Sequence, residues 1–168
     1  MKFKLRKFRK GDEGSLQKNI NDAGIARYTL DIPYPYTRKD AVAWIRKNLK
    51  LQKSRKPEKI NFVIEIDGEV AGSVGLSDIN RKNKRAELGY WLARKYWNKG
   101  IMTRAIRPMI RFGFEKLRLV RIYAFVFPPN KASKRVLEKA GFKLEGKLRK
   151  TIVKNGKLYD NLLYAKVR

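Results

Sequence analysis

The segment best suited to chemistry runs from a predicted strand through a turn into a predicted helix. The strand ends in Ala86-Glu87-Leu88-Gly89-Tyr90-Trp91-Leu92, and Asn98-Lys99-Gly100 precedes the helix that begins near Ile101. Backbone N–H groups converge at such a junction and a helix start carries partial positive charge, so the junction can hold a phosphate. Lys95, Lys99 and Arg104 add formal charge beside it. An Asn-Lys-Gly turn before a helix also occurs without any ligand, so both interpretations stay open.

Two missing residue types exclude several classes of enzyme. The 168 residues contain no Cys and no His. No disulfide, thiol nucleophile, imidazole base, or metal site with thiolate or imidazole ligands can therefore form, which excludes the Ser–His and Cys–His hydrolases.

The charge is strongly positive, with 42 Lys and Arg against 15 Asp and Glu and a formal net charge of +27. Such a chain attracts polyanions, which include nucleic acid, a ribosome, an acidic protein or a phosphorylated cofactor. Charge alone does not choose among them, and each single cation can equally belong to a solvated surface.

We expect a single domain over residues 1–168. The length suits one domain, and the 43% of hydrophobic residues can supply a core. No apolar run approaches the roughly 20 residues that span a bilayer, and residues 1–6 lack the apolar segment of a signal peptide. The expectation is a cytoplasmic protein with no membrane segment.

The elements that position the chemical segment alternate along the whole chain. Apolar alternation predicts a strand over residues 3–8, a polar helix over 10–21 follows, and Thr37 with Asp40 starts another helix after the Pro33-Tyr34-Pro35-Tyr36 loop. Asp67-Gly68 predicts a hairpin of strands 60–66 and 70–76, followed by a strand over 85–92 and an amphipathic helix over 99–117. A strand over 120–127, a helix from Asn130 to Gly141, and a hairpin around Asn155-Gly156 complete the chain. This order predicts an α+β, or mixed α/β, sandwich with a central, mostly antiparallel sheet.

The phosphate-binding segment resembles a motif of the Gcn5-related N-acetyltransferases, the GNAT family. Lys95-Tyr96-Trp97-Asn98-Lys99-Gly100 occupies the place of Gln/Arg-x-x-Gly-x-Gly/Ala at the strand-to-helix junction. Lys95 replaces Gln/Arg, and Asn98 replaces the first Gly. Asn is the non-glycine residue that best tolerates the left-handed conformation, so the loop can keep its shape. If Asn98 does not adopt that conformation, the affinity for pyrophosphate suffers.

Other segments extend the resemblance to the ribosomal-protein acetyltransferase branch over nearly the whole chain, in order. They are the 33–37 loop before a helix with Trp44-Ile45, the Glu87-Leu88-Gly89-Tyr90 strand, and Asn130-x-x-Ser133-x-x-x-Leu137-Glu138-Lys139-x-Gly141-Phe142. The implied fold has helices on both faces of the sheet and a splayed fourth and fifth strand.

The resemblance implies that acetyl-CoA lies between these two strands, residues 90–93 against 124–127, where a bulge breaks their pairing. Exposed strand amides then bind the pantetheine arm, and a backbone N–H of Trp91 or Leu92 polarises the thioester carbonyl. The implied cofactor-binding residues are Trp91, Leu92, Ala93, Lys95, Asn98, Lys99, Gly100, Ile101, Met102, Thr103, Asn130 and Ser133.

Two residues are the candidate catalytic groups. Glu87 is the candidate base, acting through water; its alternative role is a strand glutamate paired with Arg85 or another cation. Ser133 is the candidate hydrogen-bond donor to the leaving thiolate, because Leu137 stands where many relatives carry a tyrosine acid. Asn130 can cap its helix and bind the cofactor at once. Transfer is expected to be direct, since no Cys can carry the acetyl group and Ser has no His to activate it.

The acceptor is expected to be a protein N-terminal α-amine of the ribosomal-protein type, displayed near a ribosome or other nucleic acid. An α-amine, with a pKa near ~8, needs less help to become neutral than a lysine near ~10.4. Tyr34 and Tyr36 line the acceptor pocket or simply pack. Two alternatives remain open: acetylation of a small-molecule amine, such as a polyamine or antibiotic-like compound, and a non-catalytic basic module that binds nucleic acid.

Overall fold

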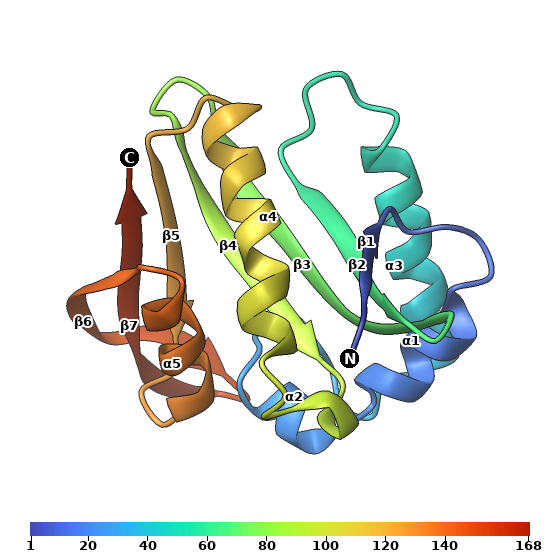
Figure 1. The fold of residues 1–168 in the computed structure, drawn as a ribbon. Helices are drawn as coiled ribbons and strands as arrows, with labels where there is room; N and C mark the ends of the chain where they lie inside the picture. Colours follow the sequence, from blue (N-terminus) through green and yellow to red (C-terminus); the bar gives the residue numbers. More distant parts are fainter.

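A seven-stranded sheet with the order β1-β2-β3-β4-β5-β7-β6 organises the computed structural model, which describes residues 1–168 (Figure 1). All neighbouring strands are antiparallel except β4 and β5, which are parallel. The strands are β1 Lys4–Arg6, β2 Ile60–Ile66, β3 Glu69–Asn80, β4 Arg85–Leu92, β5 Arg121–Val126, β6 Lys143–Lys154 and β7 Lys157–Val167. The expected α+β sandwich with a mostly antiparallel sheet is confirmed.

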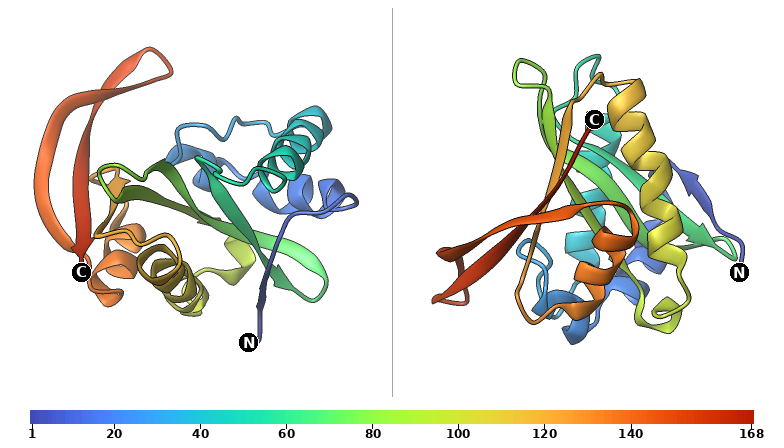
Figure 2. Two further views of the ribbon diagram at one scale, coloured as in Figure 1. Left: turned by 90° about the horizontal axis from the view of Figure 1, so that it is seen from above. Right: turned by 60° about the vertical axis from the view of Figure 1, so that its left-hand side comes forward.

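Helices cover both faces of this sheet (Figure 2). On one face lie α1 Glu13–Ile20 and α3 Arg38–Leu51; on the other lie α4 Ile101–Glu115 and α5 Lys131–Lys139. The short helix α2 Ala23–Arg27 lies at one end of the sheet, beside the loop that follows β4 (Figure 1). The helix expected over residues 10–21 is confirmed as α1, with its ends a few residues inside that range, whereas the short helix α2 was not expected. The side chain of Asp22 accepts hydrogen bonds from the N–H groups of Gly24 and Ile25, which makes it the N-cap of a new helix.

Local signals set the turns as expected. Asp67 and Gly68 both have positive φ, 50° and 77°, as do Asn155 and Gly156 at the tip of the β6–β7 hairpin. Thr37 and Asp40 form a reciprocal capping box at the start of α3.

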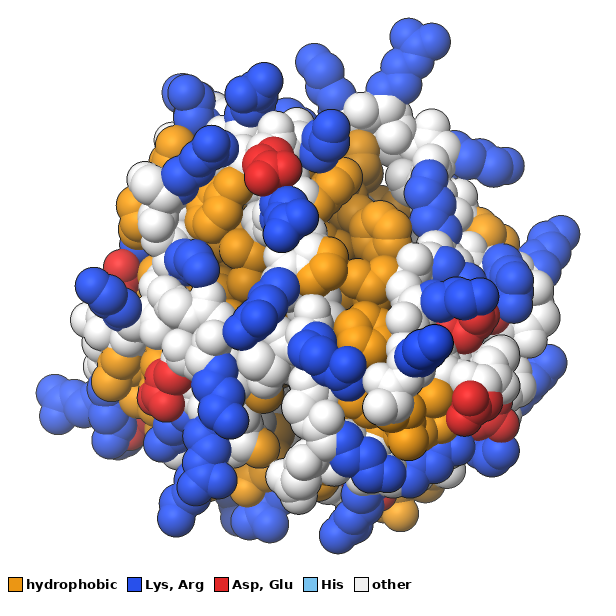
Figure 3. All heavy atoms as spheres, in the orientation of Figure 1, with side chains coloured by type: hydrophobic (Ala, Val, Ile, Leu, Met, Phe, Trp, Pro, Cys, Tyr) orange, Lys and Arg blue, Asp and Glu red, His pale blue; other side chains and the backbone are white.

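The molecular surface is rich in Lys and Arg, which are spread over the face that α4 and α5 present (Figure 3). Acidic side chains are few on this face. None of the helices combines the length and the apolar character that crossing a membrane requires.

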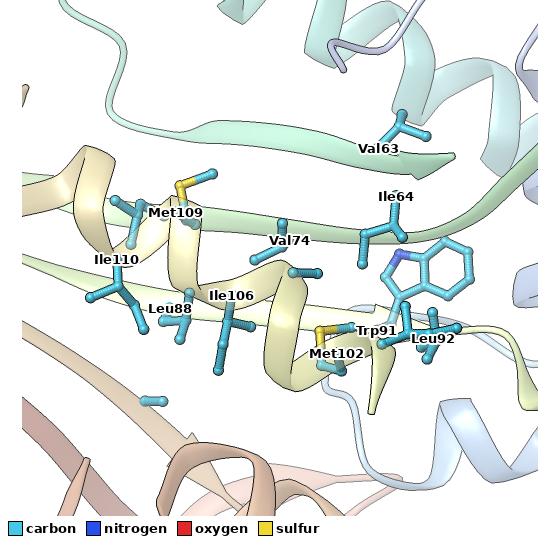
Figure 4. Packing of buried hydrophobic residues seen from close by; sticks show 14 of the residues in the cluster. Val63, Ile64, Val74, Leu88, Trp91, Leu92, Met102, Ile106, Met109 and Ile110 are labelled. Carbon is cyan, nitrogen blue, oxygen red and sulfur yellow. The ribbon is translucent and has the colours of Figure 1, made fainter. Parts of the chain in front are cut away.

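The amphipathic helix α4 is held against the sheet by its apolar side (Figure 4). Met102, Ile106 and Met109 are buried, and they lie over Val74 of β3 and Leu88 of β4. Burying an aliphatic side chain of this size contributes about 1.5–3 kcal/mol. This packing fixes the start of α4 relative to the end of β4, and so fixes the loop that joins them.

Candidate active site

Strands β4 and β5 part after a short stretch of pairing. They pair only where Arg85–Glu87 meets residues 121–123. Beyond this point β4 stays paired with β3 as far as Leu92, and β5 stays paired with β7 as far as Val126. The expected gap between residues 90–93 and 124–127 is therefore present.

The expected position of a bulge beside this gap is wrong. The register between β3 and β4 is continuous from Glu87 to Leu92, and the shift lies between Ser77 and Asn80 of β3. β3 has one more residue than β4 across this shift, and an extra residue bends a strand and increases its twist. The irregularity thus lies at the start of the gap, on the neighbouring strand.

Alternation along β4 decides which of its amides face the gap. The N–H of Ala93 donates to the carbonyl of Ala71 in β3, 2.8 Å away, so Trp91, two residues earlier, also pairs with β3. The peptide groups of Tyr90 and Leu92 point the other way, toward β5. Of the two amides considered for polarising a thioester, only that of Leu92 faces the gap. Its carbonyl is already taken by the indole Nε1–H of Trp97, 2.6 Å away.

The loop from β4 to α4 forms a cradle of free amides. Asn98 and Gly100 both adopt the left-handed conformation, with φ of 60° and 67°, which confirms the conformation expected of Asn98. The N–H groups of residues 98–103 donate no hydrogen bond within the protein; the first helical bond is from Arg104 to the carbonyl of Gly100. No acidic residue lies in the first turn of α4. Six free N–H groups at a helix start fit a pyrophosphate.

The lysines near the cradle have different surroundings. The Nζ of Lys95 lies 3.1 Å from a carboxylate oxygen of Glu69, so its side chain is directed to an ion pair. Hydrogen bonds from Lys18, Asn19 and Lys95 lower the pKa of Glu69 to about 2. Lys99 is exposed, and its Nζ lies 5.9 Å from the centre of the Tyr96 ring. Of the two expected cofactor-binding lysines, only Lys99 has its amine outside an ion pair.

The start of α5 brings three polar side chains together. The carbonyl oxygen of the Asn130 side chain accepts the N–H of Ser133 at 3.1 Å, so Asn130 is the N-cap, and its amide group is left free to donate. The hydroxyl of Ser133 lies 2.7 Å from the hydroxyl of Tyr90 on β4. Burial raises the pKa of Tyr90 above its ordinary value, so this phenol stays neutral. Leu137 is fully buried and takes no part.

Tyr90 was missed by the sequence reasoning. The pattern that could have indicated it is the position of Tyr90 between Leu88 and Leu92. Alternation along the strand places all three side chains on the face that carries α4 and α5.

Glu87 lies on the opposite face of β4, toward α1–α3, because it differs from Tyr90 by an odd number of residues. Its carboxylate makes no hydrogen bond and no ion pair, so the alternative of pairing with Arg85 is not seen. Burial raises its pKa, Asp78 and Asp31 raise it further, and Lys59 opposes them. Tyr123 is its cross-strand neighbour on β5. A carboxylate with a raised pKa and no cationic partner is suited to accepting a proton.

The two tyrosines expected in an acceptor pocket have different environments. Tyr36 is buried in the core, its N–H donates to Asn21 at 2.8 Å, and burial together with Asp40 raises the pKa of Tyr36 to about 12. Tyr34 is 58% exposed. Of the two rings, only that of Tyr34 is presented to an incoming molecule.

The β6–β7 hairpin reaches across to the loop after α2. The Nζ of Lys154, at the end of β6, donates to the backbone carbonyls of Ala26, Arg27 and Thr29. The same Nζ lies over the ring of Phe127, at the end of β5. Phe127 also packs edge-on against Tyr159 of β7, with ring centres 5.9 Å apart. These contacts connect the far end of the sheet to the segment that leads into the Tyr34–Tyr36 loop.

Comparison with known proteins agrees with this geometry. Residues 2–143 match the family model described as "Acetyltransferase (GNAT) domain". A putative ribosomal N-acetyltransferase, YdaF of Bacillus subtilis, is 37% identical over 59% of this chain, and the match spans 54% of that relative's length. The spermidine N(1)-acetyltransferase of Escherichia coli K12 is 32% identical over 95% of this chain and 82% of its own.

A solved structure matches the fold over nearly the whole of this chain. The crystal structure of the microcin C7 self-immunity acetyltransferase MccE, in complex with acetyl-CoA and AMP, has a TM-score of 0.87 and 28% identity. The match covers 99% of this chain and 92% of that one. With the family match over most of its length, the parted strands and the cradle of free amides, this chain belongs to the GNAT family of acetyl-CoA-dependent N-acetyltransferases.

Proposed function

We propose that this protein transfers the acetyl group of acetyl-CoA directly to a primary amine, and that the amine is a protein N-terminus. The observation that carries the proposal is the arrangement along one stretch of chain. It runs from the unpaired carboxylate of Glu87, through the gap-facing amide of Leu92, to the six free amides of residues 98–103. A group that can accept a proton, an N–H that can stabilise an oxyanion, and a loop that can bind phosphate thus follow one another along the chain.

The donor side lies on the face of α4 and α5. The free amides of residues 98–103 would hold the pyrophosphate, and the side-chain amide of Asn130 would donate to the pantetheine arm. Bound acetyl-CoA supplies a thioester. Transfer would form a C–N bond and break the C–S bond, and the proton that the nitrogen then loses would pass to the departing thiolate to give the CoA thiol. The Leu92 N–H would donate to the thioester oxygen as charge develops there. The Ser133 hydroxyl would donate a hydrogen bond to the departing sulfur.

The acceptor side lies on the opposite face, and the gap between β4 and β5 joins the two. Glu87 would remove the proton of the incoming ammonium, through water, and so free the electron pair that forms the C–N bond. For an α-amine with a pKa near ~8, a carboxylate with a raised pKa is a sufficient base at neutral pH. No Cys is present to carry the acetyl group, which supports direct transfer.

The second candidate acceptor is a small cationic amine such as spermidine. It is favoured by the similarity to a spermidine N(1)-acetyltransferase over 95% of the chain. It is also favoured by Asp31 and Asp78, whose charges act on Glu87, because carboxylates there offset the repulsion that a +27 protein exerts on a polyamine.

The experiment measures thiol release from acetyl-CoA with three acceptors: a peptide with a free N-terminus and no Lys, the same peptide with a blocked N-terminus, and spermidine. The proposal expects release with the free peptide alone and a mass increase of one acetyl group on its N-terminus. Thiol release with spermidine and not with the peptide would show that the acceptor is a small amine instead of a protein N-terminus. Binding of nucleic acid without release on any amine would favour the non-catalytic module instead.

A further inference from the structure

A basic groove separates α4 from the C-terminal end of α5. The groove has a volume of about 460 Å³. It is lined by Arg107, Ile110, Arg111, Lys139, Ala140, Gly141 and Lys166. Four of these seven side chains are cationic, and none is acidic. Lys166 is fixed in place, since its Nζ donates to the carbonyl of Ala140 at 2.7 Å and so caps the end of α5.

The cations of α4 and α5 form no ion pairs within the protein. α4 and α5 carry seven Lys and Arg residues, yet none of them takes part in the ion pairs of the structure, which lie on the other elements. The only acidic residues of these helices are Glu115, at the end of α4, and Glu138, which accepts the hydroxyl of Tyr164. Glu115 follows Arg111 by four residues and Glu138 follows Lys134 by four, yet neither carboxylate forms an ion pair. Seven cations against two carboxylates leave these helices with an excess of five positive charges.

The acetyl-CoA site does not account for this groove. Arg107 and Arg111 lie seven and eleven residues into the chain after Gly100, which at ~1.5 Å per residue is about 10 and 16 Å along the helix axis. Lys139 lies at the end of α5 opposite to Asn130. The cofactor cradle is at the other end of both helices.

We propose that the α4–α5 groove docks onto the phosphate backbone of RNA. Arg107 and Arg111 lie one helical turn apart on the exposed side of α4, so they offer two guanidinium forks at a spacing of about 6 Å. A guanidinium fork binds phosphate through paired hydrogen bonds. Lys139 and Lys166 supply charge from the opposite wall of the groove. An RNA chain, whose phosphates repeat at regular intervals, can contact the cations on both walls of the groove.

RNA fits the groove better than an acidic protein does. The only apolar side chains in the lining are Ile110 and Ala140, and both are buried. The groove therefore has no pocket for the aromatic or aliphatic anchor on which protein interfaces depend. A-form RNA is recognised largely through its backbone and shape, which suits a groove lined by cations. The proposal does not depend on which amine accepts the acetyl group.

The test compares two triple variants that lose the same charge. The first removes the groove cations by Arg107→Gln, Arg111→Gln and Lys139→Gln. The second, on the opposite face of the sheet, changes the exposed α3 cations by Arg46→Gln, Lys47→Gln and Lys50→Gln. Lys166 is left intact because it caps α5. Binding of a fluorescent RNA duplex is measured by anisotropy over a series of salt concentrations.

The groove variant should bind RNA at least about tenfold more weakly at ~0.1 M salt, and the slope of log K against log salt should fall by about 2–3. The α3 variant should stay within about twofold of the unchanged protein. If both variants lost RNA affinity equally, the affinity would depend on net charge alone and the proposal would be overturned.

Two controls separate this proposal from the others. Both triple variants should keep their affinity for CoA, their melting temperature and their rate on a free N-terminal peptide in the absence of RNA. Displacement of the RNA by saturating CoA would place both ligands in one site and overturn the proposal, as would equally tight binding of poly-glutamate.

Discussion

The hydroxyl groups of Tyr90 and Ser133 lie 2.7 Å apart and connect β4 to the first turn of α5. Tyr90 is partly buried, its phenol is neutral because burial raises its pKa, and it holds the serine beside the gap between β4 and β5. Tyr90 is therefore a positioning residue: it holds the orientation of a hydroxyl that would face the leaving sulfur.

Tyr90→Phe should lower turnover by about threefold to tenfold, because the Ser133 hydroxyl loses the partner that orients it. The loss of one hydrogen bond should cost about 1 kcal/mol of folding stability. Ser133→Ala should lower turnover to a similar extent, and the double variant should be no slower than the slower single one. Losses that multiply in the double variant, in steady-state assays, would show that the two hydroxyls act separately.

Glu87→Gln should lower turnover by about 10²-fold while the affinity for CoA, measured by calorimetry, stays the same. The unchanged enzyme should lose activity as the pH falls through the raised pKa of Glu87, and the variant should lack this acid limb. Glu115→Gln is the matched control, because Glu115 is an exposed carboxylate without an ion pair. Identical pH profiles for the Glu87 variant and the unchanged protein would remove Glu87 from the mechanism.

The same substitution should also change stability in a pH-dependent way. Burial raises the pKa of Glu87, so its ionised form destabilises the folded state at neutral pH. Glu87→Gln should therefore raise the melting temperature at pH 7. This gain should vanish below the ordinary pKa of a glutamate, where the carboxyl is protonated in both the folded and the unfolded state. A gain that is independent of pH would contradict the argument.

Gly100→Glu should weaken CoA binding at least about tenfold, because it places a negative charge within the amide cradle. No atom lies within 4 Å of an added Cβ, so the effect would not come from a steric clash. Gly68→Glu is a matched control, since Gly68 also has positive φ and open space around it, in the β2–β3 turn. Both variants should lose about 1–2 kcal/mol of stability, and only the first should lose CoA affinity.

Two substitutions of Asn130 separate its two roles. Asn130→Asp keeps an oxygen to accept the Ser133 N–H but loses the amide donor, so stability should hold while CoA affinity falls. Asn130→Ala should lose both, with a cost of about 1 kcal/mol in stability. Denaturation and CoA titration of the same samples give the two readouts. Unchanged CoA affinity in Asn130→Asp would leave Asn130 as a cap alone.

Much of this protein follows from short-range features of its sequence. Asp67-Gly68 and Asn155-Gly156 set two hairpins, Thr37 with Asp40 starts α3, and Asn98 and Gly100 adopt the left-handed conformation the loop needs. These outcomes depend on residues that are neighbours in the chain, so propensity and local hydrogen bonding suffice to predict them.

Other features depend on contacts between distant segments. The short helix α2 was not predicted, because an aspartate such as Asp22 can stand in a loop as well as cap a helix. The bulge in β3 was misplaced because strand register depends on partners on both sides. The pairing of Tyr90 with Ser133, 43 residues apart, and the lack of an ion pair at Glu87 have no local signal.

By itself the sequence determined the order of the strands and of the longer helices, the shape of the cradle loop and the absence of thiol and imidazole chemistry. The tertiary structure alone decided which amide faces the gap and that the carboxylate of Glu87 is partly buried without an ion pair. It also decided which cations share a groove. Residue types and turns are local properties, whereas direction, burial and pairing arise only when a strand or helix meets its neighbours.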